Sequence, residues 1–214
     1  MLRRIHLIML FCCLPALAVV LDRIAVVVDT HVIKTSDIDR DLRVTEFLNR
    51  DKLDLSLGAR RKAAERLIDQ SVIREEMEKG AYIRSNTADL EAMQKQLLQQ
   101  RFAGSDVRMK AELATYGLSL EQLRLQLQWQ LDVLKFIDQR FRPGVLVTDE
   151  EVKAYYDQHT ADLKRQYPQI KTYEGMEPKI RESLEGERLN QNFEQWLANA
   201  RKGSRIEYRQ GAFQ

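Results

Sequence analysis

The sequence contains few of the residues that interrupt regular secondary structure. Only 9 of its 214 residues are glycine and 4 are proline. A chain so poor in turn residues argues against a β-sandwich or barrel built from many short strands. Hydrophobic residues make up 44% of the chain and the net charge is only +2, which argues against disorder throughout. The length suits one domain or two small ones around a buried core.

The common motifs of enzyme active sites are also missing from the sequence. The glycines are spread singly, so neither a dinucleotide-binding loop nor a phosphate-binding P-loop is present. The patterns G-x-S-x-G and H-E-x-x-H do not occur. We interpret His31 as a solvated turn residue and His159 as a complement to a helix C-terminus. The sequence therefore predicts neither an enzyme nor a metal site, and it implies no cofactor.

The first 18 residues have the pattern of a secretory signal peptide. Two arginines precede an unbroken apolar run over residues 7–14, and the A-x-A sequence at 16–18 is a cleavage pattern. We expect cleavage after Ala18, which leaves a mature chain of residues 19–214 without an integral membrane span. The alternative is a retained membrane anchor, because apolar residues continue to position 21, near the lower limit for a span.

Both cysteines, Cys12 and Cys13, lie inside this N-terminal segment. The mature chain would therefore contain no disulfide, thiol nucleophile or zinc–thiolate site. A secreted protein without disulfides favours a periplasmic location. Removal of Arg3 and Arg4 would leave 32 basic against 32 acidic residues. This balance gives no overall attraction to nucleic acid or to an anionic membrane.

Residue periodicity predicts a mainly α-helical chain with a small β-sheet. Two β-branched runs at 24–28 and 32–33 predict an N-terminal strand pair, although Thr30 suits the tight turn between them poorly. Residues 205–208 predict a C-terminal strand, which we expect beside the N-terminal pair because isolated strands are unstable in water. Helices are expected at about 36–49, 59–79, 87–101, 105–117, 119–141, 148–163 and 173–202.

Three of these helices carry sequence signals for their N-termini. We expect Ser36 to cap the first helix, with acidic residues in its first turn. Ser119 with Gln122 and Thr148 with Glu151 have the spacing of capping boxes.

Five segments of the sequence resemble those of the SurA-type periplasmic chaperones. The opening RIAVVVDTHVIKTSDID, at 23–39, is similar to that family's strand pair and first helix. The remaining segments, in the family's order, are AERLIDQSVIREEMEKGAYIRSN at 64–86, ATYGLSLEQLRLQLQWQL at 114–131, VTDEEVKAYYDQH at 147–159 and KIRESLEGERLNQNFEQWLANARKGSRIEY at 179–208. Together they span nearly the whole mature chain.

The resemblance implies a helical chaperone module in which an N-terminal strand pair and a C-terminal strand form the small sheet. In that family a parvulin-type prolyl isomerase domain usually precedes the closing helix, but here only residues 157–172 lie in that place. We therefore expect a single SurA-like domain over 19–214 that lacks the isomerase. Its parts are strands and helices at 22–142, a helix and short linker at 143–172, and the closing helix and strand at 173–214.

Two functions are consistent with this resemblance. The first is a holdase-type chaperone that binds unfolded or extended secreted or outer-membrane proteins in the periplasm. The second is a structural or assembly partner of one specific envelope complex, for which the 119–141 helix offers a homodimer contact.

Flexible methionine and aromatic side chains suit a surface that binds many polypeptides. The candidate peptide-binding residues are therefore Met93, Phe102, Met109 and Tyr116, with burial in the core as the alternative for each. Trp196 lies on the apolar side of the closing helix, and we expect it in the core.

Overall fold

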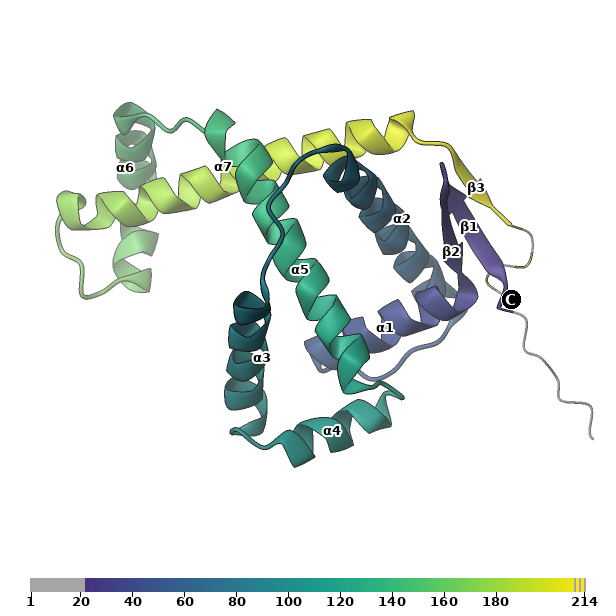
Figure 1. Ribbon diagram of the computed structural model, residues 1–214. Coiled ribbons are helices and arrows are strands. Elements are labelled where there is room, and N and C mark those ends of the chain that lie inside the picture. Colours follow the sequence, from purple (N-terminus) through teal and green to yellow (C-terminus); the bar gives the residue numbers. More distant parts are fainter. Residues whose placement is uncertain (1–21, 210, 212, 214) are drawn as a thin grey trace, which may run out of the picture.

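The computed structural model describes residues 22–209, 211 and 213, so the predicted signal peptide at 1–18 lies outside the described residues. The described chain is mainly helical with a small three-stranded antiparallel sheet, which confirms the predicted fold class (Figure 1). The elements are β1 (Ile24–Val28), β2 (His31–Lys34), α1 (Thr35–Asn49), α2 (Leu57–Lys79), α3 (Thr87–Phe102), α4 (Asp106–Thr115), α5 (Leu120–Phe141), the 3-10 turn η1 (Arg142–Gly144), α6 (Asp149–Gln166), α7 (Tyr173–Gly203) and β3 (Ile206–Tyr208).

The two ends of the described chain meet in the sheet, whose strand order is β2-β1-β3. In β1, Val28 lies opposite His31 of β2 on one side and opposite Ile206 of β3 on the other. The predicted pairing of the C-terminal strand with the N-terminal pair is therefore confirmed. In the turn between β1 and β2 the positive φ, 51°, falls on Asp29. The β-branched Thr30 thus avoids the left-handed region, which aspartate tolerates better.

Asp29 also connects this turn to the C-terminal strand. Its backbone N–H donates to the carbonyl of Arg205 at 2.9 Å, and its carboxylate accepts a bond from the Arg205 N–H at 2.9 Å. Beyond β3, the N–H of Arg209 donates to the carbonyl of Ala25 at 2.9 Å. Hydrogen bonds therefore hold β3 to the N-terminal strands at both of its ends.

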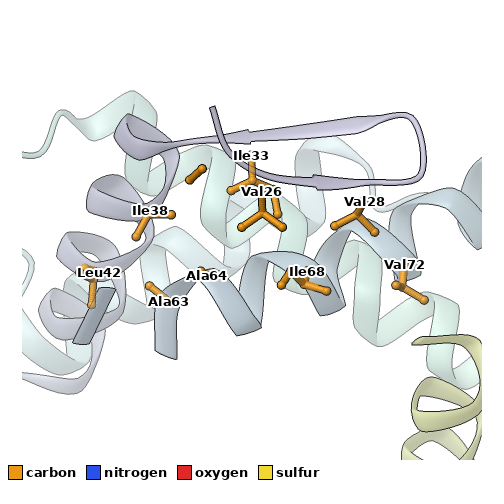
Figure 2. Close-up of a cluster of buried hydrophobic side chains, with 10 residues drawn as sticks. Val26, Val28, Ile33, Ile38, Leu42, Ala63, Ala64, Ile68 and Val72 are labelled. Carbon is orange, nitrogen blue, oxygen red and sulfur yellow. The ribbon is translucent and has the colours of Figure 1, made fainter. Parts of the chain in front are cut away.

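One face of the sheet packs on α2, as Figure 2 shows. Val26, Val28 and Ile33 point from the strands toward the helix, where Ala64 and Ile68 complete the same buried cluster. The alanine side chain lets the helix backbone approach the strands closely. Full burial of each larger aliphatic side chain contributes about 1.5–3 kcal/mol relative to exposure. This cluster is what holds the sheet to the helices.

The observed helix N-caps agree with those predicted from the sequence, with one exception. Reciprocal capping boxes are present at Asn86, Ser119 and Thr148. The prediction that Ser36 caps α1 is wrong, because the helix already begins at the preceding residue. The Ser36 hydroxyl instead donates to Asp22 at 2.5 Å, and the Asp37 carboxylate accepts from the backbone N–H of Lys34 at 3.0 Å. Asp37 thus satisfies a backbone donor at the helix start that Ser36 does not reach.

The long helix α7 joins two parts of the molecule. Its N-terminal half packs on α6 around a small apolar cluster that includes Val152, Met176 and Ile180. Its C-terminal half packs on α2 and α5 and leads into β3. Figure 1 shows α6 and the start of α7 at the end of the molecule opposite the sheet. Residues 167–172 connect α6 to α7.

Aromatic side chains fill the junction between α5 and α7. Phe136 is fully buried at its centre, with the rings of Tyr82, Phe141 and Trp196 at centroid distances of 4.9, 5.9 and 5.4 Å. Their interplanar angles of 60–89° are edge-on arrangements, which aromatic pairs favour. Trp196 is therefore half-buried and packs against this core cluster, on the apolar side of the helix as its position predicts.

Candidate functional site

A cleft of about 530 Å³ lies between the sheet edge and the helices. Its walls come from β2, α1, α2 and α5, and Arg84 of the α2–α3 connection reaches into it. Ile33 and Val44 are buried at its base, where they belong to the clusters that hold the sheet and the first helix. The cleft is therefore built on packed elements and does not depend on a loop for its shape.

Large apolar side chains are exposed on two elements that line the cleft. Val32 of β2 is 47% exposed and Leu125 of α5 is 60% exposed. Trp129, one helical turn after Leu125, is half-buried and adds an aromatic face. The guanidinium of Arg74 lies over this ring, 4.5 Å from its centroid. Exposed apolar side chains that converge on a hollow are typical of surfaces that bind another apolar group.

Uncharged polar groups share the walls with these apolar side chains. Four glutamines line the cleft, at positions 70, 122, 126 and 128. An amide carries both donors and an acceptor, so those of its groups that are not bonded within the chain can satisfy the peptide groups of a bound chain whatever its side chains are. Three of them also bond within the chain. Gln70 donates to Asp41 at 3.4 Å, Gln122 accepts from the Ser119 N–H at 2.8 Å, and Gln128 donates to the Ser85 hydroxyl and to Asp132.

The strand that borders the cleft is an edge strand. β2 pairs with β1 on one side only, and the other side has no strand partner among residues 22–209. The exposed Val32 lies in the middle of this short edge. Open strand edges present backbone N–H and C=O groups that can pair with an extended peptide. The edge, the amides and the apolar walls thus all suit a polypeptide segment.

The acidic groups of the cleft are already paired with arginines. Asp37 bonds Arg40 at 2.5 Å, and Asp132 lies 3.7 Å from Arg84. Asp41 is buried and bonds Arg66 at 2.5 Å. Burial raises the pKa of Asp41 above its usual value, although the guanidinium of Arg66 opposes this shift. Among these carboxylates, Asp41 therefore has a structural role beside the cleft base.

His31 lies at the edge of the cleft, at the start of β2 and not in the turn, and its side chain is only partly solvated. Its side chain is 27% exposed, and its Nε2 atom is 3.9 Å from the Glu78 carboxylate. Its Nδ1 atom is buried and has no hydrogen-bond partner among the described residues. Within that part of the chain, no group of three histidine, cysteine or acidic side chains is arranged to hold a metal ion.

The four residues predicted to bind peptide lie together, but outside this cleft. Phe102 and Met109 are buried, which is the core alternative that the sequence left open for each of them. Met93 and Tyr116 are half-buried against the same cluster, and the Tyr116 hydroxyl donates to the Asp51 carbonyl at 2.7 Å. All four therefore pack in or on the α1–α3–α4–α5 core. Their role in peptide binding stays a prediction.

The α5 residues that line the cleft are harder to identify from the sequence than the residues of the buried stripe of this helix. Leu134 lies two helical turns after the buried Leu127, but its side chain is 60% exposed. Leu125 and Trp129, spaced four residues apart, lie off the buried stripe that contains Leu123 and Leu127. An apolar pair on a second face of a helix is the pattern that indicates a second contact surface.

No helix within residues 22–209 is long and apolar enough to cross a membrane. Neither a protein-family model nor a curated protein matches the sequence.

Among solved structures, the chain resembles one from work on PEB4 and the periplasmic protein Cj1289, two structurally related SurA-like chaperones of Campylobacter jejuni. The two sequences are 16% identical and the TM-score is 0.56. The match covers 89% of this chain and 100% of the other. The chain therefore has the fold of the SurA-like chaperones.

Proposed function

We propose that the protein is a holdase-type chaperone of the periplasm and that the cleft between β2, α1, α2 and α5 binds extended segments of unfolded polypeptides. The observation that carries the proposal is the convergence of exposed apolar side chains, glutamine amides and an open strand edge on one hollow. In this proposal residues 1–18 direct export and 19–214 act as a single domain. The SurA-like fold and the signal-peptide pattern support the location.

The chemistry of the cleft favours many clients over one. Apolar contacts are non-directional, and amide and backbone hydrogen bonds address the main chain that all polypeptides share. The binding affinity of such a surface therefore depends little on the side-chain sequence of the client. Secreted and outer-membrane proteins that arrive unfolded in the periplasm present the extended apolar segments that it requires.

Replacement of Leu125 by serine is expected to weaken client binding while leaving the fold intact. The side chain is 60% exposed, so the free energy of unfolding should change by no more than about 0.5 kcal/mol. Loss of its apolar contact should cost about 1 kcal/mol of binding. The measurement is suppression of the aggregation of an unfolded β-barrel protein as a function of chaperone concentration.

Leu134→Ser is the matched control for this variant. Leu134 lies on the same helix and is equally exposed, but it does not line the cleft. The variant Leu134→Ser should suppress aggregation as well as the unmodified protein. Equal activity of both variants would place client binding elsewhere. Suppression restricted to one protein, with stable co-purification of that protein, would favour the assembly-partner function instead.

The protein is also expected to lack prolyl isomerase activity. The connection between α6 and α7, at 167–172, is far shorter than an isomerase domain. A proline-containing peptide in a protease-coupled assay should isomerise at its uncatalysed rate, over roughly tens to hundreds of seconds. An unrelated isomerase in the same assay serves as the positive control. Turnover that rises in proportion to the concentration of this protein would contradict the expectation.

A further inference from the structure

Among the described residues, the cleft contains a guanidinium, that of Arg74, that forms no ion pair with a carboxylate. The cleft carboxylates Asp37, Asp41 and Asp132 are each within 4 Å of an arginine, as described above. Arg74 of α2 also lines the cleft, yet it forms no ion pair with another residue of the described chain. The nearest acidic residue on its own helix face is Glu78, one turn further along, which lies beside His31.

The guanidinium of Arg74 is held in a defined place. It lies 4.5 Å from the centroid of the Trp129 ring, an arrangement in which the ring face attracts the cation. A guanidinium that stacks through its flat face keeps the N–H donors at its edge for a ligand, and their fork geometry fits a carboxylate. Stacking also reduces the side-chain entropy that binding would otherwise cost.

Apolar side chains lie immediately beside this donor group. Trp129 itself and Leu125, one turn earlier on α5, are on the same wall of the cleft. Val32 and Leu125 are the exposed apolar groups that a bound side chain would cover. A ligand that fills the cleft and also satisfies Arg74 therefore needs an apolar side chain next to a negative charge.

We propose, on the basis of the proposed function, that the cleft prefers extended client segments in which an aspartate, a glutamate or a terminal carboxylate lies beside a large apolar residue, and that Arg74 binds this carboxylate. The preference is added to a binding mode that otherwise depends on apolar contacts and the main chain. It makes the chaperone selective among unfolded segments and disfavours basic ones.

Two short peptides that differ at one position test the preference. Both carry a central leucine in an extended sequence, flanked in one by glutamate and in the other by glutamine. Trp129 provides the signal in a Trp196→Phe background, where it is the only remaining tryptophan of the 2 in the chain. The glutamate peptide is expected to bind about fivefold more tightly, as an exposed charge-assisted pair allows. The difference should shrink at high salt.

Arg74→Gln should abolish this difference, so that both peptides bind with the affinity of the glutamine peptide. Arg61→Gln is the matched control, because Arg61 is an exposed arginine of the same helix that lines a separate pocket beside Tyr208. This control should keep the fivefold preference. A preference that persists in Arg74→Gln but disappears in Arg61→Gln would overturn the assignment.

The outcomes separate this inference from the proposed function. Equal affinity of the two peptides for the Trp196→Phe protein, with binding still weakened by Leu125→Ser, overturns the role of Arg74 and leaves the cleft as the client site. Failure of both peptides to change the Trp129 signal, or binding that Leu125→Ser does not weaken, overturns the proposed function of the cleft.

Discussion

Deletion of residues 203–214 is expected to lower the free energy of unfolding by about 3–5 kcal/mol, a large part of the stability of a domain of this size. The deletion removes β3, which pairs with β1 from Ile206 to Tyr208. It also removes the apolar contact of Ile206 with the cluster between the sheet and α2. β1 would then carry unpaired backbone groups along one edge.

The deletion breaks further contacts that β3 makes with α2. The Tyr208 hydroxyl donates to the Glu65 carboxylate at 2.7 Å, and Glu65 in turn pairs with Arg201 at the end of α7. The bonds between Arg205 and Asp29 at the β1–β2 turn are lost as well. Because each of these contacts joins residues far apart in the sequence, their loss reduces the stability of the whole domain.

Urea denaturation followed by circular dichroism measures this change. Ile206→Ala is a milder companion variant, which keeps the backbone ladder and should cost only about 1 kcal/mol through lost burial. A deletion protein that unfolds at the same urea concentration as the full chain would show that β3 adds nothing to the sheet. A larger loss for Ile206→Ala than for the deletion would be equally inconsistent with this account.

Local chemistry explains why most of the fold was predictable from the sequence. The capping boxes at Ser119 and Thr148 satisfy helix N-terminal donors with neighbouring residues, so their signals do not depend on distant contacts. The start of α1 shows the limit of such signals. Ser36 has the chemistry of a cap, but Asp22 accepts its hydroxyl, and Asp37 reaches the backbone of Lys34 in its place.

The candidate site was harder to predict because it depends on what the packing leaves uncovered. Phe102 and Met109 have the side chains of a promiscuous surface, but Phe47 of α1 stacks against Phe102 at 6.3 Å and closes that surface. Leu125 and Leu134 are equally exposed, and they differ in that only Leu125 lines the cleft. Helical periodicity places residues on a face, and it does not say which faces a neighbouring element covers.

Trp196→Ala is expected to destabilise the protein by about 3 kcal/mol, near the lower limit for a large aromatic residue in a core, because its ring is partly exposed. The ring packs edge-on against Phe136 and lies 5.7 Å from Phe141 and 6.0 Å from Phe193. Removal would leave a cavity between α5 and α7, the junction that anchors the C-terminal half of the closing helix. Thermal unfolding and urea titration measure the loss.

The other tryptophan gives the contrast that separates folding from function. Trp129→Ala should cost less stability, about 1–2 kcal/mol, because this ring lines the cleft and is not packed among several aromatic rings as Trp196 is, although both are half-buried. It should nevertheless weaken client binding more than Trp196→Ala does, when both variants are compared below their unfolding temperatures. Folded Trp196→Ala should bind peptide with unchanged affinity. A stable Trp196→Ala protein with impaired binding would instead place Trp196 on the client-binding surface. The α5–α7 junction, and not the cleft, would then be the site that contacts the client.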